Sequence, residues 1–420
     1  MSAPARHVDV LVVGAGPVGL LSATLLAGRG LSVAVVDEDW RPAIHSYAAL
    51  LHADVTAMLA RLGLGDELRS RGRRIRAAAF YEGGERRAEL SLTDSAGAAA
   101  LAIPQSSLEE LLLAAAARLG VEPAWNHRLA AFETRSDGVV AWLDRLERAS
   151  GGYATATTSR AVGGSVTVRA RWLVGADGHR SAVRRILGST FAEAAPGRVV
   201  GAFELAAPTA MTDELRVVLD EQTVGTCWPL PDGRCRWGFG LPADAAAVAR
   251  ASAGRPPVLV GRRAWLTIRP AVLDALLARH APWFPRGVAD LTWSVAVRFD
   301  RRLAEPVGRG TVWLVGDAAH VTVPFAAWSL NRGLAEAAEL AELIAGAGGR
   351  GGPAAVDAWG TRLIADWREL LGPGAGFTAG PAASDWVRRH AARLPECVPA
   401  GGDDLGRALA QVGLVPARVS

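Results

Sequence analysis

The first forty residues combine two apolar runs with a glycine-rich turn and a helical pattern. Apolar residues dominate 8–13, glycines follow at once, apolar positions recur at helical spacing over 17–29, and a second apolar run ends at Asp37. Short runs without polar alternation are typical of strands buried on both faces of a parallel sheet. The segment therefore predicts a strand–helix–strand unit of an α/β fold.

Two kinds of pattern alternate along the rest of the chain. Leu and Ala recur at helical spacing over 107–119, strand-like runs follow over 123–143, and a Gly-, Ser- and Thr-rich stretch over 148–165 predicts a hairpin tip before a strand at 166–174. From 187 to 300, strand-like runs alternate with turns, which predicts a second sheet. A strand over 311–315 and a helix over 331–345 return to the first pattern, and the last fifty residues contain two short helical patterns.

Composition excludes several classes of protein. The 420 residues, half of them hydrophobic, can bury a large core. The 46 basic residues are all arginine and stand against 42 acidic ones, without a basic stripe that alternates with aromatic residues, so no nucleic-acid partner is expected. No run reaches the roughly 18 apolar residues of a membrane helix, and the N-terminal run does not resemble a signal peptide. Three cysteines without metal or disulfide spacing predict no metal site and a reducing, cytoplasmic location.

The first motif that carries chemistry is the turn Gly14-Ala15-Gly16-Pro17-Val18-Gly19 between the first strand and helix. Glycines there permit a tight turn and let backbone amides approach a pyrophosphate at the helix N-terminus. Asp37, about 20 residues further on, stands where a carboxylate accepts ribose hydroxyls. Strand, helix, spacing and acid agree, so the sequence predicts a dinucleotide site.

Two further motifs follow predicted strands. The sequence GADGHRSAVR occupies 175–184, and GDAAH occupies 316–320. Either alone is compatible with an ordinary strand-end turn that carries a capping aspartate. Their joint occurrence and order are the informative signal.

In this order and spacing, the three motifs resemble those of the flavin-dependent aromatic hydroxylases, the para-hydroxybenzoate-hydroxylase-like family, over nearly the whole chain to about residue 370. The resemblance implies an α/β fold in which an FAD-type Rossmann domain carries an inserted mixed or antiparallel sheet. It also implies a set of residues that contact FAD, in the order of its ADP part, pyrophosphate, flavin ring and ribityl chain: Gly14, Gly16, Gly19 and Asp37, then Asp177 and Gly178 with Arg184 as helper, then Gln105, then Asp317.

The implied activity is that of an FAD- and NAD(P)H-dependent monooxygenase. NADPH would bind only transiently, since the chain has no second Rossmann motif, and the reduced flavin would activate oxygen to hydroxylate an electron-rich ring. Family and composition together predict a polyaromatic, polyketide-like small molecule of bacterial secondary metabolism as substrate. The oligomeric state stays open.

The flavin loop departs from the family pattern. Relatives usually read Pro-x-Gly-Gly-x-Gly-x-Asn, because glycines let the backbone lie against the flavin ring. This chain keeps Pro324 and Asn331 but has Ala326, Ala327 and Ser329 in place of the three glycines, with Ser329 a candidate cap for the next helix.

A second departure lies near the expected pyrophosphate. Tyr47 stands where relatives commonly carry an arginine that contacts this group, and Arg41 is a candidate substitute. Two readings therefore remain: a working monooxygenase, or a repurposed fold, flavin-free or with a non-redox flavin, that catalyses cyclisation, dehydration or isomerisation. A third reading, a non-catalytic binding protein, is disfavoured because Gln105, Asp177 and Asp317 are retained.

Aromatic and titratable residues supply candidates for substrate contact. Trp228, Trp237 and Trp293 fall on predicted strands of the inserted sheet, where a substrate ring could stack, and Trp328 adds a ring to the flavin loop. A turn at 231–233 that sets Leu230 opposite Cys235 would make Trp228 and Trp237 neighbours across a hairpin. Core packing is the alternative for each tryptophan.

Three residues are candidates for acid–base or anchoring roles. His52 and Tyr47 lie near the expected junction of flavin and substrate, and Arg298 matches a family arginine that precedes the late motif. An ordinary hydrogen bond is the alternative for His52, and a surface salt bridge is the alternative for Arg298.

These patterns predict three parts of the chain. Residues 1–75, 100–187 and 300–370 form a discontinuous FAD-binding domain, 76–99 and 188–299 form a substrate-binding sheet domain, and 371–420 form a short C-terminal helical segment. The active cavity is expected between the two domains.

Overall fold

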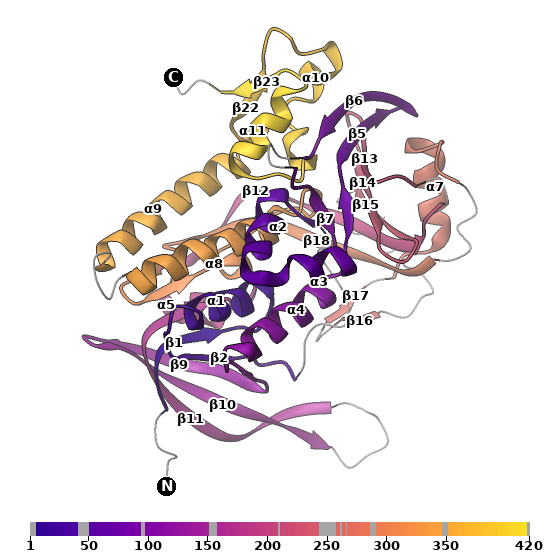
Figure 1. Ribbon diagram of the computed structural model, residues 1–420. Coiled ribbons are helices and arrows are strands. Elements are labelled where there is room, and N and C mark those ends of the chain that lie inside the picture. Colours follow the sequence, from indigo (N-terminus) through magenta and orange to yellow (C-terminus); the bar gives the residue numbers. More distant parts are fainter. Residues whose placement is uncertain are drawn as a thin grey trace.

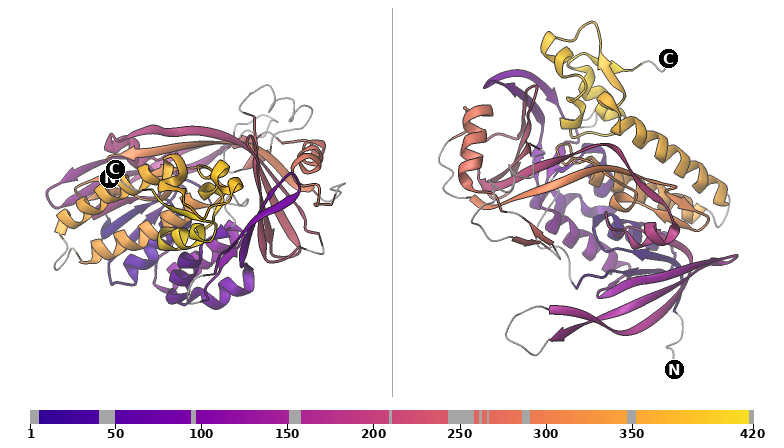
Figure 2. Two further views of the ribbon diagram at one scale, coloured as in Figure 1. Left: turned by 90° about the horizontal axis from the view of Figure 1, so that it is seen from above. Right: turned by 180° about the vertical axis from the view of Figure 1, so that it is seen from behind.

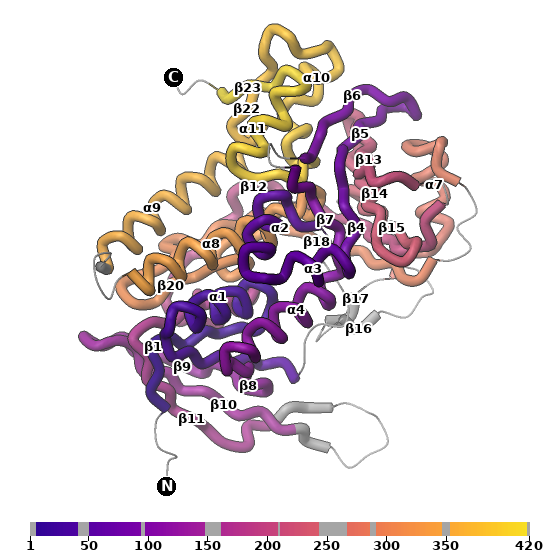
Figure 3. The backbone as a smooth tube through the Cα atoms, in the orientation of Figure 1, coloured from indigo at the N-terminus to yellow at the C-terminus, as the bar shows by residue number. Residues whose placement is uncertain are grey.

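Two eight-stranded sheets form the framework of the protein (Figure 1). The computed structural model describes residues 6–40, 50–93, 97–150, 158–208, 211–242, 258–260, 263–265, 267–285, 291–346 and 352–417. Strands of the first sheet come from the start, the middle and the late part of the chain. Figure 3 colours the backbone by residue number, so that these parts can be followed. The predicted α/β architecture is confirmed.

The first sheet has the order β19-β20-β11-β1-β2-β8, and β10 and β9 continue from β11. β1 pairs in parallel with both β11 and β2, as expected for a strand–helix–strand unit. Its strands are β1 (Arg6–Val13), β2 (Val33–Val36), β8 (Pro123–Ala124), β9 (His127–Arg135), β10 (Gly138–Ser150), β11 (Thr158–Gly175), β19 (Gly308–Arg309) and β20 (Val312–Leu314). Residues of β1, β2 and β11 form one hydrophobic core with α1 (Pro17–Ala27), α4 (Gln105–Arg118), α8 (Trp328–Gly346) and α9 (Gly352–Leu371).

The second sheet has the order β21-β18-β12-β15-β14-β13-β5-β6. Its long strands β12 and β18 run side by side and connect the two halves of the molecule (Figure 2). The strands are β5 (Ala77–Glu82), β6 (Glu85–Ser91), β12 (Thr190–Ala206), β13 (Glu214–Leu219), β14 (Val224–Leu230), β15 (Arg234–Leu241), β18 (Leu291–Glu305) and β21 (His320–Val321). One face packs against α7 (Pro270–His280) in a separate aromatic-rich core.

Shorter elements complete the structure. β3 (Leu50–Leu51), β7 (Ala100–Ala102) and β4 (Arg73–Ile75) form a small sheet beside α2 (Ala53–Leu59), the π-helix η1 (Ala60–Leu64) and α3 (Gly65–Arg71). β16 (Val258–Val260) pairs with β17 (Arg263–Trp265). The remaining short elements before the C-terminal part are α5 (Ala182–Leu187) and the 3-10 turn η2 (Gly316–Ala318). The C-terminal part consists of η3 (Pro373–Gly376), β22 (Phe377–Ala379), α10 (Asp385–His390), η4 (Pro395–Cys397), α11 (Gly402–Ala410) and β23 (Leu414–Pro416). No described helix combines the length and apolar character needed to cross a membrane.

Two local predictions were wrong. The Gly-, Ser- and Thr-rich stretch over 148–165 does belong to a hairpin, because β10 and β11 pair antiparallel, but the predicted tip is strand up to residue 150 and from residue 158 onward. Residues 151–157 lie outside the described part. In the β14–β15 hairpin, Leu230 pairs with Arg234 and not with Cys235. The loop has three residues because Asp232 and Gly233 both take positive φ, which closes the turn one residue earlier than expected.

This register separates two tryptophans that were predicted to be neighbours. Trp228 lies opposite Arg236, whereas Trp237 lies opposite Cys227, so the two indoles project from opposite faces of the sheet. Trp237 packs in the core beneath α7, stacked on Phe239 at 4.8 Å between ring centroids.

Candidate active site

The turn between β1 and α1 has two glycines that chain packing requires and one that faces open space. Gly14 has a φ of +108°, and a Cβ on it would lie 2.2 Å from the carbonyl oxygen of Ala176. A Cβ on Gly19 would lie 2.0 Å from the carbonyl oxygen of Gly14. At Gly16, by contrast, a Cβ would meet no protein atom within 4 Å. The open space lies at the N-terminus of α1, where backbone N–H groups favour a phosphate.

The main cavity, about 590 Å³ in volume, lies where the three sequence motifs meet. Its size falls within the range of roughly 300–1,000 Å³ that is usual for small-molecule sites. Each motif contributes to its wall, as do the start of α4, strand β18 and the loop before α8: Gly16, Gln105, Gly178, Arg298, Asp317 and Pro324. The side chain of Gln105 is held by a hydrogen bond that its Nε2 donates to Glu109 Oε1 at 2.8 Å.

Asp37 supports the glycine turn from the end of β2. Its Oδ2 accepts the N–H of Ala15 at 2.7 Å, and its Oδ1 accepts the N–H of Asp39 at 2.7 Å. Burial raises the pKa of Asp37 above its usual value, and the two hydrogen bonds oppose that shift. The carboxylate thus fixes the backbone of the turn.

The second motif is joined to the third by Arg184. Asp177 caps α5, since its Oδ2 accepts the N–H groups of Ala182 at 2.6 Å and Val183 at 3.1 Å. Arg184 donates from Nη1 to the carbonyl oxygen of Ala318 and from Nη2 to that of His179, both at 2.7 Å. The bond to Ala318 links the second motif to the third, and residues of both motifs line the main cavity.

Asp317 belongs to the η2 turn and faces the main cavity. Its side chain is exposed to the cavity. The surrounding protein atoms nevertheless desolvate the carboxylate and raise its pKa, while the nearby His320 opposes this shift. An acceptor at this position suits the hydroxyl groups of a ligand.

A buried carboxylate supports the η2 turn from behind. Glu336 Oε2 accepts from His320 Nε2 at 2.7 Å and from the N–H of Gly316 at 3.2 Å, and Oε1 accepts from Trp367 Nε1 at 2.8 Å. The His320 ring stacks on Trp367 with centroids 3.8 Å apart. Burial opposes ionisation of Glu336, but its hydrogen-bond donors and nearby Arg332 hold its pKa below the usual value. The network fixes the backbone that carries Asp317.

The flavin loop is held from several sides. Asn331 Nδ2 donates to the carbonyl oxygens of Ala327 at 2.8 Å and Leu50 at 2.9 Å. His52 donates from Nε2 to the carbonyl oxygen of Ala326 at 2.7 Å, and Trp328 donates from Nε1 to that of Ala400 at 3.2 Å. The loop is therefore braced by the C-terminal part of the chain.

Of the three residues that replace glycine, only Ala327 has a positive φ, at 54°. A left-handed conformation costs a non-glycine residue about 1–2 kcal/mol. Replacement by glycine would remove this cost, but part of the gain would be lost because glycine loses more chain entropy on folding. We therefore expect Ala327→Gly to raise the free energy of unfolding by up to about 1 kcal/mol in urea titration. Ala326→Gly is the matched control and should lower it by about 0.5–1 kcal/mol. Equal effects would contradict the assigned strain.

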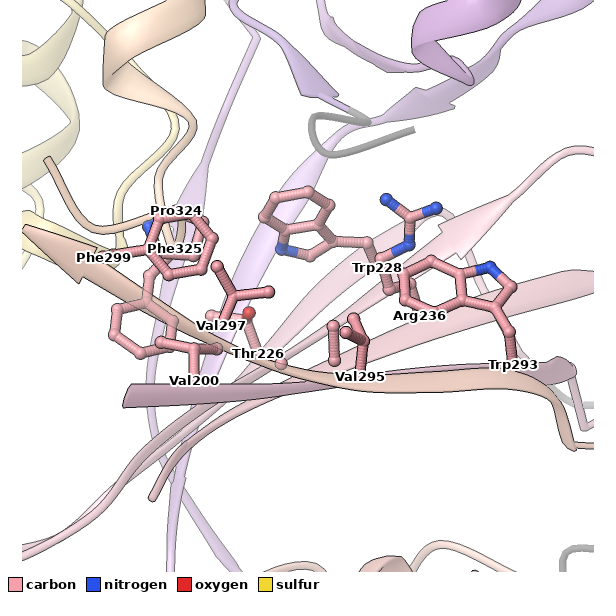
Figure 4. A pocket seen from close by; sticks show the side chains of 12 residues that line it. Val200, Thr226, Trp228, Arg236, Trp293, Val295, Val297, Phe299, Pro324 and Phe325 are labelled. Carbon is pink, nitrogen blue, oxygen red and sulfur yellow. The ribbon is translucent and has the colours of Figure 1, made fainter. Parts of the chain in front are cut away.

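A second cavity lies on the face of the second sheet that adjoins the flavin loop (Figure 4). Its volume is about 40 Å³, and its wall is mostly aliphatic and aromatic. Trp228 and Trp293 line it, with Arg236 beside them. Val297, Phe299 and Pro324 line both cavities, so the two adjoin at the flavin loop.

The structure brings together part of the predicted site and leaves other residues apart from it. Arg298 lines the main cavity, its side chain 59% exposed and 3.1 Å from Asp300. His52 is buried behind the flavin loop. Trp328 and Trp237 are packed in cores, and neither is among the residues that line the two cavities. Ser329 accepts the N–H of Thr322 at 3.1 Å and lies within α8, so it does not cap that helix. Tyr47 and Arg41 lie outside the described residues.

Sequence reasoning missed three charged residues that organise the site: Glu336, Arg236 and Glu204. Glu336 offered a signal, because it interrupts the apolar face of α8 between Leu334 and Ala337. A charge on a buried face indicates a paired group. Arg236 and Glu204 gave no comparable signal, since charged residues are usual on a half-exposed strand.

Comparison with known proteins decides the family. The family described as "FAD binding domain" matches residues 7–363. The chain belongs to this family. Membership confirms the resemblance to flavin-dependent hydroxylases and the Rossmann-type fold predicted from the motifs.

The chain is similar to two relatives and, in fold, to a more distant neighbour. Rifampicin monooxygenase of Streptomyces venezuelae is 31% identical over 366 residues, which cover 85% of this chain and 66% of the relative. OxyS anhydrotetracycline hydroxylase of Streptomyces rimosus matches with a TM-score of 0.64 and 25% identity, over 87% of this chain and 67% of that one. The Diels-Alderase PyrE3 of pyrroindomycin biosynthesis shares the fold, with a TM-score of 0.63 and 22% identity over 86% and 71% of the two chains.

The curated relatives are longer than this chain, which spans 62% and 66% of the first two.

The described residues fit FAD. Open space at Gly16 meets the N-terminus of α1, and the same cavity presents the Gln105 amide and the Asp317 carboxylate. Groups suited to contact a phosphate, a ring and a sugar alcohol thus line one cavity.

Proposed function

We propose that this protein is an FAD- and NAD(P)H-dependent monooxygenase that hydroxylates a polycyclic, polyketide-like aromatic compound. The observation that carries the proposal is the junction of the two cavities at Val297, Phe299 and Pro324. A ring that lies at this junction would border the apolar cavity and meet a flavin in the main cavity. The names of relatives that act on rifampicin and anhydrotetracycline support a substrate of this class.

Bound FAD would supply the redox and oxygen chemistry, as cofactors do in such enzymes. The chain's own residues bind and orient. Gly16 leaves room for phosphate, Asp317 accepts hydroxyl hydrogens, and the loop from Pro324 to Asn331 is a braced platform. Aliphatic and aromatic side chains of the second cavity exclude water from the reacting ring.

The proposed division of labour follows the three predicted parts. Residues 1–75, 100–187 and 300–370 would bind FAD, 76–99 and 188–299 would bind substrate, and 371–420 would brace the flavin loop. The hydrogen bond from Trp328 to Ala400 supports the last assignment. NADPH would approach transiently at the open rim that carries Arg298, whose positive charge suits a phosphate group.

The visible absorption spectrum of the purified protein, followed by FAD titration, tests the proposal. We expect flavin bands that NADPH bleaches and that return with oxygen, because the cofactor would cycle between both states. Product formation should require NADPH and oxygen. A colourless protein that ignores FAD and converts substrate anaerobically would overturn this function in favour of a non-redox cyclase, dehydratase or isomerase.

A further inference from the structure

Trp228 presents a buried hydrogen-bond donor to the second cavity. Its side chain is 5% exposed, and it lines that cavity from β14. The indole Nε1 has no hydrogen-bond partner among the described residues. Figure 4 draws this nitrogen on the cavity side of the ring, toward Thr226 and Val297. A buried indole N–H usually has an acceptor, because an unmade hydrogen bond is costly away from water. A ligand oxygen in the cavity would supply one.

Three other buried indoles show why the position of Trp228 matters. Their N–H groups also have no hydrogen-bond partner among the described residues, but each ring packs against another aromatic ring, with centroids 4.8 to 5.0 Å apart: Trp237, Trp283 and Trp386. None of the three is among the residues that line the two cavities. Of these four donors, Trp228 is the one placed to meet a ligand.

An ion pair beside the same wall favours a neutral ligand oxygen. Arg236 donates from Nη2 to Glu204 at 2.6 Å, and Trp293 donates from Nε1 to the same carboxylate at 3.2 Å. The positive charge of Arg236 is therefore already paired with an anion. Because a second anion buried here would need a cation of its own, an uncharged acceptor is the less costly partner for Trp228.

The volume of the second cavity, about 40 Å³, limits the group that enters it. A single water molecule requires roughly 10–15 Å³, so the cavity admits an oxygen and the ring edge that carries it, but not a fused ring system. Val297, Phe299 and Pro324 line both cavities, so the rings would lie at this junction. A carbonyl oxygen on one ring edge would then reach toward Trp228.

We propose that Trp228 donates a hydrogen bond from Nε1 to a carbonyl oxygen of the aromatic substrate and so orients the ring system at the junction of the two cavities. The inference names a substrate class, aromatic ketones and quinones, and the residue that selects it. It rests on the proposed function for the reaction, but the hydrogen bond itself is measurable without turnover. A water molecule held by the Trp228 N–H is the competing outcome of the test.

Nuclear magnetic resonance of protein that carries isotope-labelled tryptophan tests the hydrogen bond directly. The probes are 1-tetralone, which has a carbonyl on a fused ring, and tetralin, which has the same rings without oxygen. They are added to the purified protein with FAD and without NADPH. We expect 1-tetralone to move the indole N–H proton of Trp228 downfield, because a carbonyl acceptor deshields it, whereas tetralin should not. Loss of this signal in Trp228→Phe, or in Trp228→Leu if the first variant does not fold, assigns it. The N–H signals of Trp237, Trp283 and Trp386 should stay unchanged.

Calorimetric titration with the same probes separates the hydrogen bond from packing. Trp228→Phe keeps an aromatic ring and removes the N–H, so the ratio of 1-tetralone affinity to tetralin affinity should fall roughly 2- to 10-fold. Trp293→Phe is the matched control, since it makes the same change in the same wall at an N–H that Glu204 already accepts. It should leave the affinity ratio unchanged. The melting temperature of each variant reports folding separately.

Two results would overturn the inference. One is a Trp228 signal that 1-tetralone leaves in place, whether a water molecule keeps the N–H or the ketone does not bind. The other is an affinity ratio that Trp228→Phe leaves unchanged or that both variants lower equally. Loss of NADPH-dependent turnover with the shift of the Trp228 signal intact would instead refute the proposed function alone.

Discussion

Replacing Gly16 by alanine should strongly weaken FAD binding and leave the fold intact. Gly16 has a φ of −73° and a ψ of 179°, a conformation that alanine adopts readily. A Cβ there meets no protein atom within 4 Å, but it would enter the space reserved for phosphate at the N-terminus of α1. We expect FAD affinity to fall on the order of 100-fold, as two charge-assisted hydrogen bonds are weakened. The free energy of unfolding, measured in urea without added FAD, should be unchanged or rise by up to about 1 kcal/mol.

The neighbouring glycine provides the opposite result. A Cβ on Gly19 would lie 2.0 Å from the carbonyl oxygen of Gly14, which is backbone and cannot rotate away. Gly19→Ala should therefore lower the free energy of unfolding by about 3 kcal/mol or more, with or without FAD. Flavin fluorescence titration and urea denaturation of both variants separate the effects. Normal FAD affinity in a folded Gly16→Ala protein would contradict the placement of the phosphate.

The glycine turn and the two aspartate motifs were predictable because each is local in sequence. A positive φ, a strand before it and a helix after it leave few residue types at Gly14. The order of strand, turn and helix could therefore be read directly from 8–37. The turn at Asp317 was predictable in the same way from its place after a short buried strand, and the turn lies at the main cavity.

What the sequence did not predict depends on long-range contacts. The observed register of β14 and β15 differs by one residue from the predicted register, because Asp232, which is not glycine, takes a positive φ beside Gly233. Because of this one-residue difference, Trp237 lies in the core beneath α7 and not in the predicted pocket wall. Arg236 was then placed in the cavity wall, and its partner Glu204 lies 32 residues earlier on another strand. Neither the spacing nor the local pattern of these residues encodes their pairing.

The second large effect is expected at Glu336, a buried carboxylate that sequence reasoning also missed. Three donors point to it: His320, Trp367 and the N–H of Gly316. Glu336→Ala would leave buried polar groups of His320 and Trp367 without their acceptor. We expect a loss of about 3–5 kcal/mol in the free energy of unfolding. Glu336 also holds the N–H of Gly316, which directly precedes Asp317, so FAD affinity should fall as well. Flavin titration of folded Glu336→Ala protein measures that effect.

The pH dependence distinguishes a charge from mere packing. The folded protein holds the pKa of Glu336 below its ordinary value of 4.5, so its charged form stabilises the fold above that pH. This contribution is lost as the pH falls through the lower, folded-state pKa. The stability difference between the native protein and Glu336→Gln should therefore be constant above about pH 4.5 and shrink below it. Glu342→Gln, whose side chain is 66% exposed in its pair with Arg29, should change stability by no more than about 1 kcal/mol at any pH. A difference for Glu336→Gln that does not change as the pH falls would show that Glu336 acts by its shape and not by its charge, and the η2 turn would then need no buried anion to hold Asp317 in place.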